Sequence, residues 1–183
     1  MKDLKFIDIS PLTIAGASSP QVLPRVIRNW KSPEEFAMPS GIFKPNTKGR
    51  EFMSFETSEF RDEAFAQFGF TELFREPDYR NFVGHHFLNG AYTPPHTDSA
   101  PKNYLHVRAN WMLRKPPSGG DPVLAGVTLN VNPGDLWICF ASEEVHASTP
   151  AHGGERFVCS FGALVKRPEN FNLQSYSGVL PCE

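Results

Sequence analysis

The sequence places two metal-binding side chains one residue apart. His96 and Asp98 flank Thr97 and follow the prolines Pro94 and Pro95, at the end of a candidate strand. Residues i and i+2 of an extended segment point to the same side, so both side chains can reach one ion. Two imidazoles and one carboxylate on one face of an octahedral ion leave three positions open, an arrangement that suits iron(II). A second histidine is needed to complete such a site.

Two later histidines are candidates for the second imidazole. His146 lies 48 residues after Asp98, just beyond a candidate strand, whereas His152 precedes Gly153 and Gly154 in an expected loop. A ligand is held better by rigid structure than by a loop. His146 is therefore the preferred ligand, and His152 is the alternative.

Residues 1–80 contain the helix signals of the chain. The segment 32–35 has a serine cap, a first-turn proline and a capping-box glutamate, which are typical of a helix start. A second helix is expected after Ser58, because apolar side chains recur every four residues from 60 to 68. A shorter helix is expected over residues 25–30.

From residue 82 the pattern changes to short apolar runs that end at proline or glycine. Strands are expected over residues 82–88, 92–97, 104–113, 126–131, 135–140 and 156–165. Short strands between closely spaced turns favour a mainly β fold, a sandwich or jelly roll. No linker interrupts the sequence, so we expect a single domain over 1–183, with a helical part at about 1–80 and a β core at about 82–165.

The candidate strand 104–113 separates two kinds of side chain. Its odd-numbered positions are all apolar, whereas His106, Arg108 and Asn110 lie on the opposite face. One interpretation is a sheet with one face in water. The other is that the apolar face packs under the N-terminal helices while the polar face lines a pocket. The candidate strand 156–165 alternates in a similar way.

An ordered set of motifs extends over residues 82–165. After the His-x-Asp pair the chain contains, in order, Gly119-Gly120, Pro133-Gly134, His146 and, ten residues later, Arg156. This succession resembles the 2-oxoglutarate- and Fe(II)-dependent dioxygenases. The resemblance implies a double-stranded β-helix, which is a jelly-roll variant, with helices packed on one sheet. That expectation agrees with the helical and β halves of the sequence.

The resemblance also implies roles for single residues. His96, Asp98 and His146 match the three side chains that hold iron in the family. Arg156 matches the residue that pairs with the distal carboxylate of 2-oxoglutarate, and a guanidinium suits a bidentate contact with a carboxylate. Ser160 is expected to donate a hydroxyl to the same carboxylate, although the family's serine commonly stands two residues after the arginine rather than four.

Further contacts are expected from the polar face of strand 104–113. Asn110, with Arg108 as the alternative, is expected to steady the end of 2-oxoglutarate that chelates iron. Arg108, His106 and Tyr92 are the predicted substrate contacts, with a position behind the metal ligands as the alternative for His106. No catalytic side chain beyond the metal ligands is expected. His85 and His86 are adjacent on a strand, so one of them must face inward. Structural or surface positions are the more common for such histidines.

The reaction implied by the resemblance uses Fe(II), O2 and 2-oxoglutarate, releases succinate and CO2, and most often hydroxylates the substrate. Asp98 argues against halogenation, because halogenating relatives carry Ala or Gly at that ligand position. The expected substrate is a small metabolite or an amino acid, free or bound to a peptide or carrier. Two alternatives stay open: a cupin-type metal enzyme, which would not need Arg156, and a non-catalytic jelly-roll binding module.

Composition excludes several classes of protein. The formal net charge is -2 with a pI near 6.3, and the basic residues are scattered, so no nucleic-acid partner is expected. Three cysteines without a CxxC pair argue against a disulfide framework, and Cys139 and Cys159, which lie in apolar runs, are expected to be buried reduced thiols. The start lacks the apolar stretch of a signal peptide and no run is long enough for a membrane span, so we expect a cytoplasmic protein without a membrane partner. Glu143 and Glu144 are expected to be solvated turn charges. The sequence does not indicate the oligomeric state.

Overall fold

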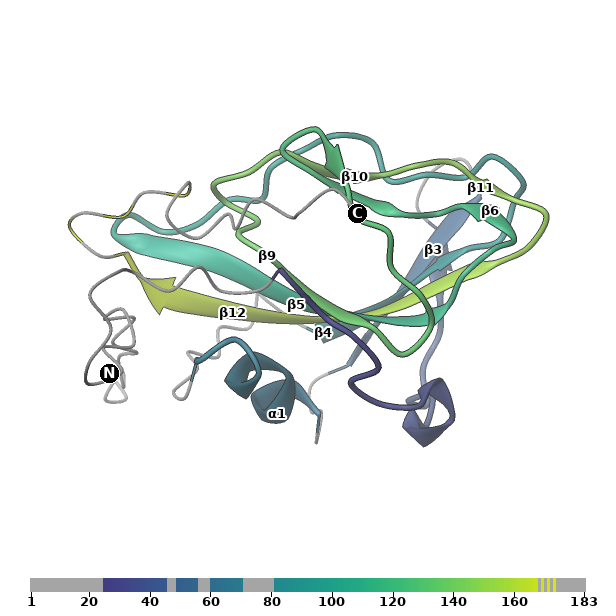
Figure 1. Ribbon diagram of the computed structural model, residues 1–183, viewed down its shortest axis with the longest axis horizontal. Helices are drawn as coiled ribbons and strands as arrows, with labels where there is room; N and C mark the ends of the chain where they lie inside the picture. Colours follow the sequence, from purple (N-terminus) through teal and green to yellow (C-terminus); the bar gives the residue numbers. More distant parts are fainter. Residues whose placement is uncertain are drawn as a thin grey trace.

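Seven antiparallel strands form the large sheet of the computed structural model (Figure 1), which describes residues 25–45, 49–55, 60–70, 81–167, 169, 171 and 173. In spatial order they are β1 (Val26–Ile27), β9 (Leu136–Cys139), β5 (Tyr104–Arg114), β12 (Arg156–Lys166), β4 (Asn81–His86), β3 (Arg50–Phe55) and β2 (Lys44–Pro45). The two longest strands, β5 and β12, pair along most of their length and form the centre of this sheet.

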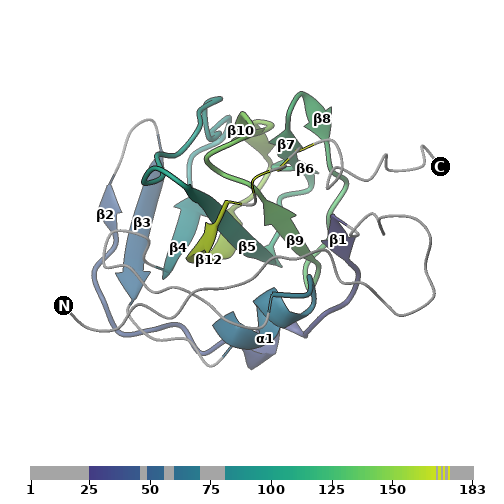
Figure 2. The ribbon, with the colours of Figure 1, turned by 90° about the vertical axis from the view of Figure 1, so that its left-hand side faces the viewer.

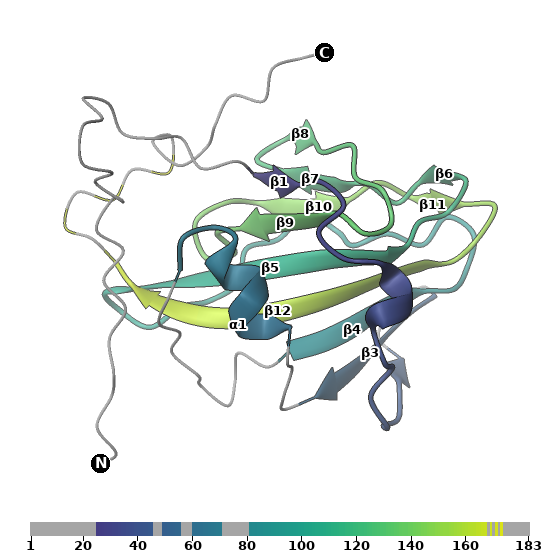
Figure 3. The same ribbon diagram turned by 60° about the horizontal axis from the view of Figure 1, so that its bottom comes forward.

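Shorter strands form a second layer over one face of the large sheet (Figure 1). One small sheet has the order β10 (His146–Ser148), β7 (Pro122–Leu124) and β8 (Val127–Thr128), and another pairs β11 (Ala151–His152) with β6 (Ser118–Gly119). The helix α1 (Arg61–Ala66) lies on the opposite face of the large sheet (Figures 2 and 3). The described part is thus mainly β, with the antiparallel sheets of a jelly-roll or cupin arrangement, as the sequence predicts.

One face of β5 packs in the core against α1, and the other face is directed toward the layer of short strands. Leu105, Val107, Ala109 and Trp111 on its apolar face are fully buried in one core, together with Phe65 of α1. Trp111 makes edge-on contacts with other rings, at centroid distances of 5.1 Å to Trp30, 5.7 Å to Phe36 and 5.4 Å to Phe60. The opposite face carries Arg108 and Asn110 into a pocket between the layers. Of the two interpretations of this strand, the structure therefore supports the pocket.

The predicted N-terminal helices are largely wrong. Residues 25–30 contain strand β1, whose Val26 and Ile27 pair with Trp137 and Leu136 of β9. The capping signal at 32–35 produces only a 3-10 turn, η1 (Pro33–Glu35), in which Ser32 N donates to Glu35 Oε1 at 2.9 Å. The expected helix after Ser58 survives as the six residues of α1, and Ser58 itself lies outside the described residues.

Strands of the predicted β core agree better with the structure. The expected strands 82–88, 104–113, 135–140 and 156–165 correspond to β4, β5, β9 and β12. The expected strand 126–131 shortens to β8, and 92–97 contains only an isolated bridge between His96 and His146. Within the described ranges, no helix is long and apolar enough to span a bilayer.

Candidate metal centre

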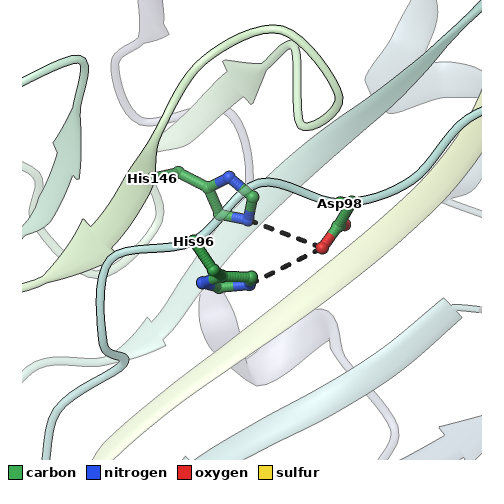
Figure 4. Close-up of side chains that lie close together, drawn as sticks. All are labelled: His96, Asp98 and His146. Atoms are coloured by element: carbon green, nitrogen blue, oxygen red, sulfur yellow. Dashed lines mark ion pairs between the residues drawn. The ribbon is translucent and has the colours of Figure 1, made fainter.

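His96, Asp98 and His146 point toward one another (Figure 4). The Nε2 atoms of His96 and His146 lie 3.6 Å and 3.9 Å from Oδ1 of Asp98. One ligand atom from each side chain falls within 4.8 Å of the other two. Two imidazole nitrogens and one carboxylate oxygen around a common point form a donor set that fits a first-row divalent ion such as Fe(II).

Backbone pairing between the layers brings the two histidines together. His96 N donates to His146 O at 3.1 Å and His146 N donates to His96 O at 2.9 Å, which places the ring centroids 4.2 Å apart. Asp98 N donates to Ala141 O at 2.8 Å, and this bond fixes the third residue relative to the segment after β9. His152, the alternative ligand, is exposed on β11 and does not belong to this cluster.

Hydrogen bonds to the backbone set the tautomers of both histidines. Nδ1 of His96 lies 2.8 Å from Pro94 O, and Nδ1 of His146 lies 3.2 Å from Glu144 O. A carbonyl oxygen only accepts, so each Nδ1 carries the proton and each Nε2 keeps its lone pair toward Asp98. Burial and the neighbouring His96 lower the pKa of His146. This ring is therefore neutral near pH 7, as ligation requires.

Asp98 is held by its other oxygen. Its Oδ2 accepts a hydrogen bond from Nε of Arg108 at 3.1 Å and lies 3.2 Å from Nδ1 of His106. Burial raises the pKa of Asp98, but the hydrogen bond with His106 and the charge of Arg108 outweigh it, so that the pKa falls well below its usual range. The carboxylate is ionised and presents Oδ1 to the histidines.

The three predicted substrate contacts lie in different places relative to the pocket. Arg108 lines the pocket but is engaged by Asp98. His106 is buried beside Asp98 and is not part of the lining, and neither is Tyr92, which is partly exposed to solvent. The arrangement of Arg108 and His106 is that of groups that orient the carboxylate.

A pocket of about 520 Å³ lies next to the cluster, within the range of small-molecule sites. Its lining comes from both layers and consists of Arg50, Phe52, Ser54, Phe82, Gly84, His86, Thr93, Pro94, His96, Asp98, Arg108, Asn110, Pro122, Leu124, Trp137, Cys139, His146, Ala147, Arg156, Val158 and Ser160. The three predicted co-substrate contacts, Arg156, Ser160 and Asn110, are all in this set.

Arg156 is buried in the pocket wall, with 6% of its surface exposed. Its Nε donates to Gly120 O at 2.7 Å. Gly120 has a φ of +74°, and a Cβ there would lie 2.9 Å from the ring of Pro116 and 3.2 Å from Cδ of Arg156, so the turn packs between these two side chains as glycine. Burial lowers the pKa of Arg156 to about 10, against the opposing charge of Asp121, and the guanidinium stays charged at pH 7. A buried cation of this kind is costly without an anionic partner.

Ser160 and Asn110 are neighbours across the β12–β5 pair. The Ser160 hydroxyl accepts a 3.3 Å hydrogen bond from Nη1 of Arg108, and Nδ2 of Asn110 donates to Arg108 O at 3.4 Å. Both side chains thus lie on the pocket face of the sheet beside the arginine that holds Asp98.

Two pocket residues have no counterpart among the predicted site residues. His86 and Arg50 stand at the same register as Arg156 on the adjacent strands β4 and β3. Burial and the charges of Arg156 and Arg50 lower the pKa of His86 to about 3, so its ring is neutral at pH 7. Residues 50–55 place polar and apolar side chains on both faces of β3, so the sequence contains no clear strand signal that would identify Arg50.

His85 and Glu144 are sequence neighbours of pocket residues but do not line the pocket themselves. His85 is buried outside the pocket lining and stacks on Phe157 at 3.9 Å, with Nδ1 2.7 Å from Oε1 of Glu51. The expectation that Glu144 is a solvated turn charge is wrong, because it is 2% exposed and forms a 2.7 Å ion pair with Arg25.

Glu143 and the cysteines complete the set of side chains whose positions were predicted. Glu143 is partly buried and pairs with Arg167. Cys139 and Cys159 are free and buried, as predicted, whereas Cys182 lies outside the described residues.

Comparisons with known proteins point to the fold. No family model matches the sequence, and no curated protein matches it. Among solved structures, the viral collagen prolyl hydroxylase of Paramecium bursaria Chlorella virus-1, in its 2OG complex, matches with a TM-score of 0.53 and 14% identity over 79% of this chain and 97% of that chain. A Pseudomonas putida prolyl-4-hydroxylase has a TM-score of 0.49 and 21% identity, over 69% of this chain and 78% of that chain. KdgF from Halomonas sp. has a TM-score of 0.42 and 12% identity, over 70% and 89%. The viral enzyme and this chain share a fold.

Proposed function

We propose that this chain is an Fe(II)- and 2-oxoglutarate-dependent oxygenase that hydroxylates a small metabolite or an amino acid, free or bound to a peptide or carrier. One observation carries the proposal. Two imidazoles and an ionised carboxylate oxygen converge at a small pocket whose wall also contains the buried cation Arg156. The fold shared with the viral prolyl hydroxylase is compatible with this function.

The residues present fit the metal that the proposal requires. His96 and His146 offer Nε2 lone pairs, Asp98 offers Oδ1, and all three atoms lie within 4.8 Å of one another. When bound, Fe(II) with O2 and 2-oxoglutarate would supply the oxidising power for hydroxylation, with release of succinate and CO2. Arg108 and His106 keep the second carboxylate oxygen of Asp98 turned away from the histidines.

Arg156 is the proposed partner of the distal carboxylate of 2-oxoglutarate. A guanidinium binds a carboxylate through two parallel hydrogen bonds, and burial strengthens this contact. The bond from Nε to Gly120 O fixes the side chain and leaves the two terminal nitrogens for such a ligand. Ser160 and Asn110, on the same sheet face, would add polar contacts along the co-substrate.

Arg156→Leu tests this assignment in the anaerobic Fe(II) protein. At a concentration of 100 times its Kd, 2-oxoglutarate should stabilise the wild type by about 2.7 kcal/mol and raise the thermal midpoint by about 5–10 °C. Arg156→Leu should lose most of this shift and keep its Fe(II) affinity. Arg114→Leu, an exposed arginine on β5 outside the pocket lining, is the matched control and should respond like the wild type.

The rival functions give different results in the same experiment. A cupin-type enzyme would respond to Fe(II) but not to millimolar 2-oxoglutarate, and a binding module would respond to neither. Either pattern in the wild-type protein would refute the oxygenase assignment. Succinate, which lacks the keto group that chelates iron, should give a smaller shift than 2-oxoglutarate.

A further inference from the structure

An apolar shelf lies on the β3–β4 side of the pocket. It consists of Phe52 on β3 with Phe82 and Gly84 on β4, and all three residues line the pocket. The two rings meet edge to face at 5.3 Å, and Gly84 pairs directly with Phe52. A Cβ on Gly84 would lie 3.4 Å from the Phe52 ring and 3.5 Å from the Phe82 ring. The absent side chain therefore leaves the surface formed by the two touching rings open toward the pocket, where a ligand can lie on it.

An arginine lies against each ring of this aromatic shelf. The guanidinium carbon of Arg108 is 4.7 Å from the centroid of Phe82, and that of Arg50 is 5.9 Å from the centroid of Phe52. Arg108 is bonded to Asp98, so the Phe82 end of the shelf is next to the candidate metal centre. A molecule lying on the shelf would have one end near that centre and the other end near Arg50.

The shelf lies beside the proposed co-substrate contacts but on different strands. Arg156, Ser160 and Asn110 lie on β12 and β5, whereas the shelf and Arg50 lie on the next two strands, β4 and β3. Among the described residues, the pocket lining contains three arginines and one carboxylate, Asp98. A lining with this balance of charge attracts anions rather than cations. The volume of about 520 Å³, shared with a co-substrate, restricts the second ligand to a small molecule.

We propose that the primary substrate is a small apolar carboxylic acid, with its aromatic or branched body on the shelf of Phe52, Phe82 and Gly84 and its carboxylate at Arg50. This inference rests on the proposed function and narrows the substrate class of the same site. Arg50 is then a residue that determines substrate specificity. Gly84 determines how closely that body can approach the two rings.

The first experiment compares acids with uncharged molecules of the same shape. The Fe(II) protein with 2-oxoglutarate and O2 is given phenylacetate, 3-phenylpropionate or 4-methylpentanoate, each beside its primary amide. The measured quantity is succinate formed above the background without substrate. We expect at least one acid to raise this rate 10-fold or more over its amide. A panel in which every amide matches its acid, or in which no acid raises the rate, overturns the proposal.

The second experiment uses variants of the shelf with a readout for the co-substrate. Arg50→Leu should abolish the preference for the acid, and Arg50→Lys should restore part of it. Gly84→Ala adds a methyl group at ordinary contact distance, so the fold should tolerate it, yet it should raise KM for the acid 10-fold or more. All three variants should keep the thermal shift caused by 2-oxoglutarate. Arg114→Leu should leave all of these quantities unchanged.

The possible failures are distinguishable. If Arg50→Leu and Arg50→Lys lose the 2-oxoglutarate shift together with the acid preference, Arg50 belongs to the co-substrate site and this inference is wrong. If Gly84→Ala leaves KM unchanged, the substrate does not lie on the shelf. If wild-type protein shows no 2-oxoglutarate shift, the proposed function itself fails, and the inference about its substrate falls with it.

Discussion

His106→Leu should weaken Fe(II) binding although His106 is not itself a ligand. Its Nδ1 lies 3.2 Å from Oδ2 of Asp98, both ring faces are buried, and burial lowers its pKa, so the wild-type ring is a neutral donor. The substitution removes the donor without changing the charge near the metal. The Ser142 hydroxyl accepts a hydrogen bond from the backbone of residue 106, and this bond survives in the variant.

The size of the effect follows from the type of bond that is lost. A hydrogen bond to a charged group contributes about 1.5–3 kcal/mol, and loss of a group that orients a metal ligand typically costs about 10- to 100-fold in affinity. Because about 1.4 kcal/mol corresponds to a tenfold change, the two figures agree. Arg108 still holds Oδ2 at 3.1 Å, so the lower half of this range, near 10-fold, is expected.

Anaerobic titration of Fe(II) against a competing chelator measures this change. His106→Asn is the matched variant, because its amide nitrogen can occupy nearly the position of Nδ1 and restore the bond to Asp98. Its affinity should lie within about threefold of the wild type, a difference of less than 1 kcal/mol. If His106→Leu binds Fe(II) as tightly as the wild type, or if His106→Asn is as weak as His106→Leu, the bond to Oδ2 does not orient Asp98.

Three further results are expected. His146→Ala should abolish tight Fe(II) binding in the same titration, whereas His152→Ala should leave it intact, and the reverse result would make His152 the ligand. The pKa of His86 is about 3 in the folded protein and near 6.5 when unfolded, so the unfolded state binds more protons between these values and stability falls as the pH drops through this window. Urea unfolding should show a loss of about 2 kcal/mol from this group between pH 6.5 and pH 5, which His86→Gln should remove; equal pH dependence in both proteins would contradict it. Gly120→Ala should lower stability by about 1–2 kcal/mol through its positive φ and also reduce the 2-oxoglutarate shift, whereas Gly126→Ala, with φ +84° and open space around it, should show only the first effect.

Strand alternation and short motif spacing were sufficient to predict the centre of the molecule. The alternation of residues 104–113 predicted which face of β5 meets the core and which meets the pocket. The i, i+2 spacing of His96 and Asp98 predicted that both could reach one ion, and the structure brings them together with His146. Both features depend on the spacing of residues within one extended segment, and this spacing can be read from the sequence.

Long-range pairing explains what the sequence did not reveal. The helix expected over residues 25–30 does not form, because β9, more than a hundred residues later, supplies backbone partners for a strand at Val26 and Ile27. Glu144 has the sequence context of a surface charge, but it is buried and paired with Arg25, which lies 119 residues earlier in the chain. The sequence leaves the roles of Arg108 and His106 open, because nothing in it indicates that Asp98 lies across from β5.

Successive residues of strand β12 face different surroundings, so we expect them to be under different evolutionary constraints. Its even-numbered positions Arg156 and Ser160 face the pocket, and its odd-numbered positions Cys159 and Phe161 are sealed in the core. Substitutions that share no partners have nearly additive effects on stability. The even-numbered residues are therefore constrained by the ligand that they contact, and the odd-numbered residues by the packing of the core. Sequence drift in relatives of this chain should consequently show a period of two along this strand.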